Sequence, residues 1–186
     1  MEGKVGLSLQ QLLTEDLVAL DFECDTKLQA IEYLVDRLVQ TNRLSHKEAL
    51  LRVILEREGM GSTGIGNGVA LPHGRMDSID EVLIVFGRAK HAVEFDALDG
   101  APVTLIFLIV SPTRHNEGYL KALSGISRLL KREKFRSTLL HAKRPEEVIE
   151  AFSEEASAIS LYALHVLAPL LHAVAGLDDV FHLPVQ

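Results

Sequence analysis

Gly61-Ser62-Thr63-Gly64-Ile65-Gly66-Asn67-Gly68-Val69-Ala70-Leu71-Pro72-His73-Gly74-Arg75 is the most informative stretch of this chain. Four glycines and an asparagine occupy its first eight positions. Glycine is used where the backbone takes a positive φ or where another group approaches closely. This half therefore predicts a tight loop whose N–H groups can face an oxyanion. The second half places a histidine between a proline and an arginine, a pattern that suits a histidine receiving a phosphoryl group.

His73 is the candidate phosphoryl acceptor. One imidazole nitrogen is unprotonated near neutral pH, and the other must donate a hydrogen bond that fixes the tautomer. A backbone carbonyl of the glycine-rich stretch can accept that bond. Phosphoryl transfer depends mainly on positioning and on positive charge around the phosphoryl oxygens. Arg57 and Arg75 are the candidate cations, because a guanidinium can hold phosphate through two N–H groups. Without further context, a single histidine in such a setting is more often structural.

The stretch Gly61–Arg75, extended upstream to Leu55-Glu56-Arg57-Glu58, carries a family resemblance. It resembles the phosphorylation-site motif of enzyme IIA domains of the phosphoenolpyruvate-dependent phosphotransferase system. The class is the mannitol/fructose class, which also contains the nitrogen-regulatory IIA proteins. The resemblance covers about residues 7–152. It favours a functional role for His73 over a merely structural one. It implies that Nε2 of His73 takes a phosphoryl from HPr or its nitrogen-branch relative, with Arg57 nearby and no cofactor.

The segment Thr113–Ser124 departs from the pattern of the sugar-transporting members. Those members commonly carry a second histidine near the start of the helix expected here, at the position that Tyr119 occupies. His115 stands four residues earlier, one helical turn away if the helix begins that soon. The imidazole of His115 can replace the missing one, or the Tyr119 hydroxyl can meet the phosphate. The alternative is that Tyr119 only packs and His115 is a solvated loop residue.

Several other classes of site fit the sequence poorly. The glycine spacing matches neither a P-loop nor a dinucleotide-binding motif. The eight histidines and the single Cys24 form no cluster with metal-ligand spacing, so no metal is expected. No nucleophile-elbow motif supports a hydrolase. The basic segment 121–144 lacks interleaved aromatic residues, so nucleic-acid binding is not expected.

Composition and charge point to a folded cytoplasmic protein. The chain has 186 residues, of which 47% are hydrophobic, enough for a real core. No apolar run reaches the length of a membrane span, and no signal peptide is visible at the N-terminus. One cysteine cannot form an internal disulfide. The net charge of −7 resides in residues 145–186, which hold seven acids and no Lys or Arg, whereas residues 121–144 hold eight basic residues and one acid. This asymmetry can steer a charged partner, or it can mark solvated helix faces.

The hydrophobic pattern predicts an α/β fold, with a mixed central β-sheet flanked by helices on both faces, as the resembled mannitol-type IIA domains have. Residues 8–20 are expected to form a helical lead-in. Capping boxes at Thr26–Gln29 and Ser45–Glu48 predict two helices. Three strands are expected. The first ends at residues 69–71, and the other two span 82–88 and 103–110, with a turn at 99–102 between them. The later helices are expected at 117–131, at 133–141 and from Pro145.

Two domains are expected, and two alternative functions fit the sequence. Residues 1–153 form the IIA-like phosphoacceptor domain, and 154–186 a C-terminal helical extension, predicted to dock on its own domain through one kinked helix or two short ones in 156–175. The first function is a phosphohistidine carrier whose charge state controls a regulated target. The alternative is a sugar-specific IIA component that passes the phosphoryl to a IIB protein. A degenerate domain that never carries phosphate is disfavoured because His73, Arg57 and Arg75 are all present.

Overall fold

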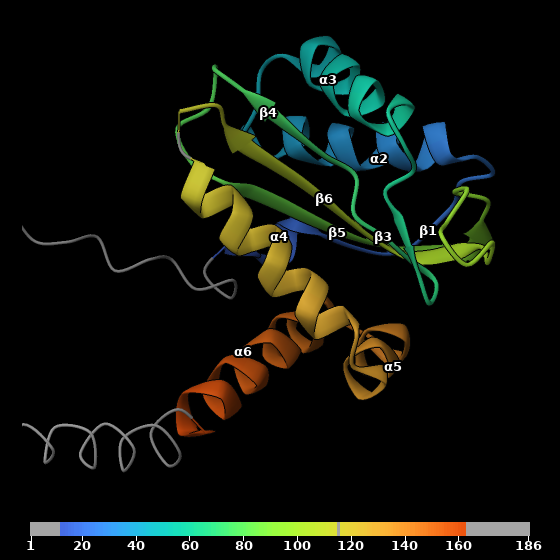
Figure 1. Ribbon diagram of the computed structural model, residues 1–186, viewed down its shortest axis with the longest axis vertical. Helices are drawn as coiled ribbons and strands as arrows, with labels where there is room; N and C mark the ends of the chain where they lie inside the picture. Colours follow the sequence, from blue (N-terminus) through green and yellow to red (C-terminus); the bar gives the residue numbers. More distant parts are fainter. Residues whose placement is uncertain (1–11, 115, 163–186) are drawn as a thin grey trace, which may run out of the picture. The chain divides into compact units, whose positions relative to one another are not determined.

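The computed structural model describes residues 12–114 and 116–162 (Figure 1). Its elements follow the order η1 (Glu15–Leu17), β1 (Val18–Phe22), α2 (Lys27–Gln40), α3 (Lys47–Gly59), β2 (Gly64–Gly66), β3 (Val69–Ala70), β4 (His73–Met76), β5 (Leu83–Val93), β6 (Val103–Pro112), α4 (Asn116–Leu130), α5 (Glu133–His141) and α6 (Pro145–Tyr162). No helix in this described part is long and apolar enough to cross a membrane.

The six strands form one mixed sheet. Its order is β1-β5-β6-β3-β2, and β4 also pairs with β6, farther along the strand than β3. β5 and β6 are antiparallel, whereas β1 runs parallel to β5, and both β3 and β4 run parallel to β6. The predicted mixed sheet is therefore confirmed.

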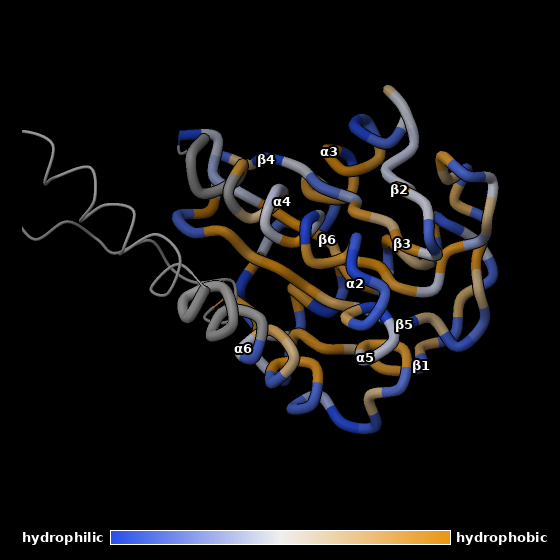
Figure 2. Tube along the Cα trace, turned by 60° about the horizontal axis from the view of Figure 1, so that its bottom comes forward, coloured by the Kyte–Doolittle hydropathy of each residue, from blue (hydrophilic) through white to orange (hydrophobic). Residues whose placement is uncertain are grey.

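Helices cover both faces of the sheet, as predicted (Figure 1). Alternate residues of β5 show the two faces. A Cβ on Gly87 would lie 2.7 Å from Leu34 Cδ2 of α2. The neighbouring Arg88 points the other way and donates to the Leu139 carbonyl of α5. Because both faces are covered there, the first half of β5 (Leu83–Phe86) and most of β6 are hydrophobic, and Figure 2 shows this hydrophobic colouring along the central strands.

The N-terminal prediction was partly wrong. Residues 8–11 lie outside the described part of the chain. A single 3-10 turn follows at Glu15–Leu17, and Val18–Phe22 is the strand β1 instead of the end of a helix. Val18 pairs with Phe86 and Ala19 with Gly87. The backbone N–H and C=O groups of this segment thus find their hydrogen-bond partners in β5. Long-range pairing of this kind overrides a local preference for helix.

Of the two predicted capping boxes, the first forms in part and the second does not form. The Gln29 side chain accepts the N–H of Asp25, one residue before the expected Thr26. The Thr26 hydroxyl accepts the Gln29 N–H at 3.2 Å and caps α2. The N-cap of α3 is His46, one residue later than the predicted Ser45, and its side chain makes no capping hydrogen bond. Lys47, the first residue of α3, instead forms an ion pair with Asp36 of α2.

The strands 82–88 and 103–110 are confirmed, and both are longer than predicted. β5 continues to Val93, which pairs with Val103, so the connection between the strands is only residues 94–102. Gly100 N donates to Ala97 O in this connection, where the turn was expected.

The later helices begin close to the predicted positions, and α6 begins at Pro145. The chain divides into two compact units, Met1–Phe152 and Ser153–Gln186. α6 extends to Tyr162, past the predicted domain boundary at 153. Residues 163–186 lie outside the described part, so the docking of a C-terminal extension stays a prediction.

Candidate functional site

His73 is the first residue of β4, at an edge of the sheet. It pairs with Ile109 of β6. Side chains alternate along a strand, so His73 and Arg75 share one face of β4 and Gly74 faces the other. A Cβ on Gly74 would lie 2.8 Å from Val53 Cγ1 of α3. The glycine therefore lets α3 pack directly against β4, which places the end of α3 beside His73.

Hydrogen bonds fix the tautomer of His73. Its Nδ1 lies 2.7 Å from the Leu71 carbonyl oxygen, which can only accept, so Nδ1 carries the proton. Nε2 then carries the lone pair of the ring. Burial is the main cause that lowers the pKa of His73 below its ordinary value, and the nearby Arg57 charge adds to it, while the Leu71 carbonyl and the Glu58 charge act in the opposite direction. The imidazole is thus held neutral at neutral pH, with its lone pair on Nε2.

Arg57 contacts this lone pair directly. Its Nε donates to His73 Nε2 at 3.1 Å, and its Nη1 donates to the Gly61 carbonyl at 3.0 Å. Arg57 lies in the last turn of α3. The predicted association of Arg57 with His73 is present in the structure, and the guanidinium is held at two of its nitrogens.

Of the other predicted site residues, the structure describes the side chain of Arg75 only. Arg75 shares a strand face with His73, and its Nη2 donates to the Thr113 carbonyl, just before α4. Tyr119 lies in α4, but its side chain is outside the described part of the structure. His115 lies outside it entirely. Their predicted roles at the phosphate stay predictions.

The glycine-rich segment forms a β-hairpin. β2 and β3 are antiparallel, and Gly66, Asn67 and Gly68 at the tip all have positive φ. The Asn67 N–H donates to the Asp99 carboxylate at 2.8 Å. β3 also lies four residues before β4 along β6, about 13 Å at the rise of a strand. Gly66 and Gly68 therefore shape the tip of the hairpin, whereas the contact of this stretch with a phosphoryl group stays a prediction.

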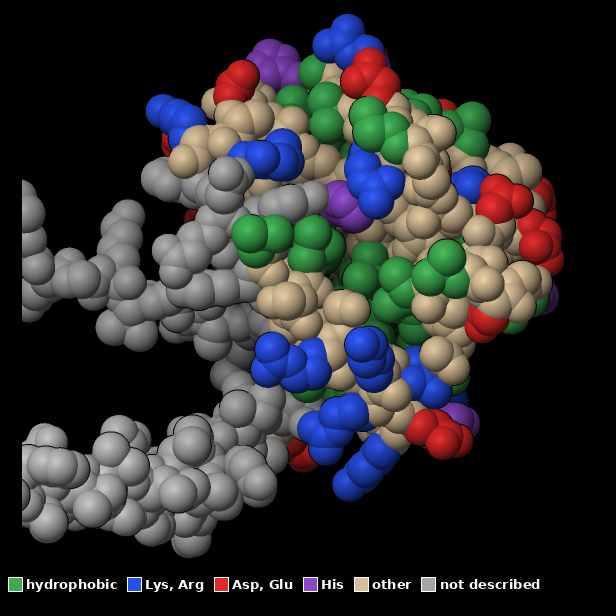
Figure 3. All heavy atoms as spheres, in the orientation of Figure 1, with side chains coloured by type: hydrophobic (Ala, Val, Ile, Leu, Met, Phe, Trp, Pro, Cys, Tyr) green, Lys and Arg blue, Asp and Glu red, His purple; other side chains and the backbone are tan. Residues whose placement is uncertain are grey.

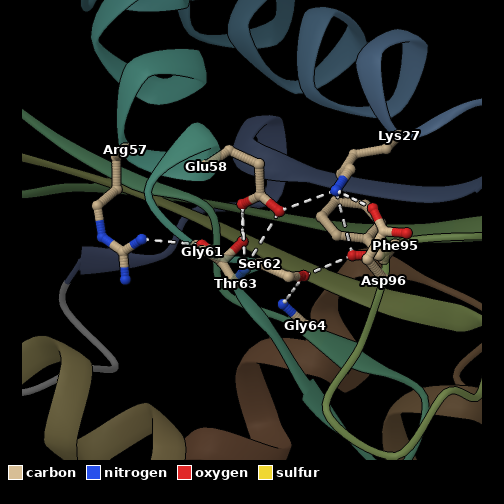
Figure 4. Close-up of polar contacts among 9 residues, drawn as sticks. All are labelled: Lys27, Arg57, Glu58, Gly61, Ser62, Thr63, Gly64, Phe95 and Asp96. Carbon is tan, nitrogen blue, oxygen red and sulfur yellow. Dashed lines mark hydrogen bonds and ion pairs between the residues drawn. The ribbon is translucent and has the colours of Figure 1, made fainter.

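Sequence reasoning did not single out Glu58 or Lys27. Glu58 is buried beside Arg57 and accepts hydrogen bonds from Thr63 and Lys27 (Figure 4). A carboxylate in the last turn of a helix, next to a functional arginine, was the signal that could have revealed it. Among residues 12–114 and 116–162, no three His, Cys, Asp or Glu side chains gather in a way that could hold a metal ion.

Comparison with known proteins identifies the family of this chain. Residues 11–155 match the family model of the phosphoenolpyruvate-dependent sugar phosphotransferase system, EIIA 2. The fructose-specific EIIA component of Haloferax volcanii is 36% identical over 75% of this chain and 90% of its own length. The fructose-specific EIIABC component of Bacillus subtilis is 36% identical over 80% of this chain, which spans only 23% of that longer protein.

A solved structure extends the similarity to the three-dimensional fold. The crystal structure of the nitrogen regulatory protein IIA-Ntr from Neisseria meningitidis has a TM-score of 0.73 and 32% identity, and the match covers 77% of this chain and 98% of that one. The relatives thus include both sugar-specific and nitrogen-regulatory proteins. The family match covers most of the chain, and we conclude that this protein belongs to the EIIA 2 family of the phosphoenolpyruvate-dependent phosphotransferase system.

Proposed function

We propose that this protein is a regulatory phosphocarrier that accepts a phosphoryl group on Nε2 of His73. The observation that carries the proposal is the geometry of the His73 ring. Nδ1 is tied to the Leu71 carbonyl, and Nε2 presents its lone pair to a guanidinium. A neutral imidazole with one nitrogen locked and the other basic is a competent nucleophile.

The proposed transfer runs between two imidazoles. The Nε2 lone pair of His73 attacks the phosphorus of a phosphohistidine on an HPr-like donor. A new N–P bond forms as the donor N–P bond breaks, and the bonding electron pair returns to the donor imidazole. His73 keeps its Nδ1 proton, so its ring becomes positively charged when Nε2 bonds to phosphorus. The hydrogen bond from Nδ1–H to the Leu71 carbonyl stabilises this charge.

Arg57 must move for this step. Its Nε–H occupies the same lone pair that attacks phosphorus, so the bond to His73 has to open when the donor arrives. The guanidinium can then turn its N–H groups to the phosphoryl oxygens while Nη1 stays close to the Gly61 carbonyl. Arg75, on the same strand face, supplies a second positive charge. His115 and Tyr119 are the proposed contributors from the side of α4.

The donor and the cellular location follow from this chemistry. An HPr protein or its nitrogen-branch relative is the proposed donor, and because its phosphoryl derives from phosphoenolpyruvate we place the reaction in the cytoplasm. We expect the donor to dock through apolar contacts. Met60, in the turn that also carries Gly61, is 83% exposed, and Leu120 of α4 is 61% exposed. Figure 3 shows hydrophobic and basic side chains together on one face of the molecule.

Regulation is favoured as the output of phosphorylation. A phosphoryl group adds about −1.5 to −2 charges, enough to make or break an interface with a target protein. Tyr119 stands where sugar-transporting members commonly carry a second histidine, and the chain resembles a nitrogen regulatory protein in sequence and in fold. The second candidate is a sugar-specific IIA component that passes its phosphoryl to a IIB protein. The similarity to the fructose-specific relatives supports it.

Phosphorylation by purified components tests the shared step. The protein is incubated with phosphoenolpyruvate, enzyme I and either HPr or its nitrogen-branch relative. We expect an acid-labile gain of one phosphoryl group that His73→Ala abolishes. His91→Ala is the matched control, because His91 is exposed on β5. No gain with either donor, or an equal gain in His73→Ala, would refute the proposal.

The output is then read from the phosphorylated protein. Onward transfer to a IIB protein would establish the sugar-specific function. Regulation would be established by a target protein whose affinity differs between the phosphorylated and unphosphorylated forms. In His73→Ala, phosphoenolpyruvate should leave this affinity unchanged.

A further inference from the structure

Glu58 occupies a position that does not favour the helix that carries it. It lies in the last turn of α3, where a negative charge opposes the helix dipole. It is also buried, with 9% of the residue exposed, and burial of a carboxylate is unfavourable unless it is paired. The stability of α3 therefore gives no reason for an acid at this position, and its contacts must be sought outside the helix.

Those contacts close the turn that follows α3. The Thr63 N–H donates to both carboxylate oxygens of Glu58 at 3.2 and 3.1 Å, and the Thr63 hydroxyl donates to Oε2 at 2.5 Å. These bonds link residue 58 to residue 63 across the turn 59–63. Because three donor contacts of Thr63 converge on one rigid carboxylate, the turn has little freedom to change its shape.

Lys27 supplies the counter-charge and ties the turn to two other elements. Its Nζ, at the start of α2, donates to Glu58 Oε1 at 3.1 Å and to Asp96 Oδ2 at 2.7 Å. It also donates to the Phe95 carbonyl, which accepts the Ser62 hydroxyl as well (Figure 4). The turn is thus fastened to α2 and to the segment that follows β5.

The turn holds Arg57. The carbonyl of Gly61, in the middle of the turn, accepts the Arg57 Nη1–H at 3.0 Å, and the same guanidinium reaches His73 through Nε at 3.1 Å. The position of the Gly61 carbonyl therefore determines where the guanidinium lies relative to the reacting nitrogen.

We propose that Glu58, with its counter-ion Lys27, is a positioning residue for phosphoryl transfer, because it fixes the 59–63 turn and through it the guanidinium of Arg57 against His73. In this proposal Glu58 acts through Arg57, without a contact of its own to the phosphoryl group. This inference rests on the proposed function of His73 and adds a residue that acts through Arg57.

Glu58→Gln is the first test, since it keeps the shape and removes the charge and one acceptor. Glu56→Gln is the matched control, because Glu56 is exposed in the same helical turn. We expect Glu58→Gln to lower the rate constant of phosphoryl transfer about 10- to 100-fold, with the half-saturating donor concentration unchanged, while Glu56→Gln matches the wild type. If Glu58→Gln does not fold, Thr63→Val removes the hydroxyl donor from the same network and Thr63→Ser keeps it.

The unphosphorylated protein gives a readout that does not require transfer. In NMR spectra we expect the Arg57 Nε–H signal to be protected in the wild type and lost in Glu58→Gln. The pKa of His73 separates two effects. Loss of the Glu58 charge alone would lower this pKa, whereas release of the Arg57 charge, the larger of the two influences, would raise it. Positioning predicts a rise.

A double variant tests whether the effect passes through Arg57. We expect Arg57→Ala with Glu58→Gln to transfer no more slowly than Arg57→Ala alone, since an interaction already lost cannot be lost twice. Additive losses in the double variant, or a folded Glu58→Gln with wild-type rate and an intact Arg57 signal, would overturn the inference. If wild type itself accepts no phosphoryl, the proposed function fails, and the Arg57 signal and the His73 pKa still decide the positioning claim.

Discussion

Arg57 Nε lies 3.1 Å from His73 Nε2, so in the unphosphorylated protein the candidate nucleophile is covered by the cation that we expect to hold the phosphoryl group. The same guanidinium is tethered to the Gly61 carbonyl. Phosphorylation therefore replaces one partner of Arg57 with another, instead of bringing in a distant side chain. The following predictions depend on this pair and on the packing that holds it.

Removing Arg57 should slow phosphorylation with little effect on folding. We expect Arg57→Ala to reduce the rate about 100- to 1000-fold, the range typical for loss of one donor to a developing charge. Arg52→Ala, an exposed position of the same helix, is the control and should match the wild type. The rate is measured by rapid quenching with phosphorylated donor in excess. Equal rates for the two variants would show that Arg57 takes no part in transfer.

The titration of His73 should show a depressed pKa. Its ordinary value is 6.5, and burial lowers it in the folded protein. As pH falls below 6.5, the unfolded chain takes up this proton first, so stability decreases. Phosphoryl acceptance is lost only as pH falls through the lower, folded pKa. Well above pH 6.5 this group adds no pH dependence to either quantity. NMR titration of the His73 ring measures the value, and a pKa at or above 6.5 would contradict the structure.

Gly74 should tolerate no side chain. A Cβ there would lie 2.8 Å from Val53 Cγ1 and 3.0 Å from Ile54 Cδ1, so Gly74→Ala must displace these side chains and disturb the packing of β4 against α3. We expect a loss of about 1–3 kcal/mol in the free energy of unfolding together with slower phosphorylation, because His73 and Arg57 sit on these two elements. Gly59→Ala, where a Cβ meets nothing within 4 Å, is the control. Urea unfolding that leaves both variants at wild-type stability would refute the tight packing.

Arg88 should be a major stabilising residue away from the site. Its buried guanidinium binds Asp21 through two nitrogens and donates to the carbonyls of Leu139, Leu140 and Ala142 at the end of α5. Arg88→Met leaves these acceptors without their donor, and we expect a loss of about 3 kcal/mol in urea unfolding. Lys90→Met removes an exposed pair with Glu23 on the same strand and should change stability by less than about 1 kcal/mol. Equal effects would show that burial of Arg88 is unimportant.

The parts of the fold that sequence predicted well are those in which local pattern and tertiary packing agree. α2 has both a capping residue and an apolar stripe, and the Thr26 cap is present. β6 is a continuous apolar run because both of its faces are covered. In such segments the burial pattern alone identifies the element.

The parts that were missed are specified by distant partners. β2 consists of two glycines around an isoleucine, and β4 contains Gly74, so neither has the composition of a strand. Each is a strand only because β3 or β6 supplies its hydrogen bonds. The glycine-rich stretch led to His73 as the candidate acceptor, which stays a prediction. The conformation of the stretch depends on Asp99, which lies outside it and accepts the Asn67 N–H.

The most direct test of the account is to find which ring nitrogen of His73 carries the phosphoryl group. The protein is labelled with ¹⁵N in its histidine rings, phosphorylated by the donor and studied by ³¹P and ¹⁵N NMR at neutral pH. The structure predicts coupling of the phosphorus to Nε2 of His73, with Nδ1 still protonated and bonded to the Leu71 carbonyl. Phosphorus bonded to Nδ1, or to a different histidine, would contradict it.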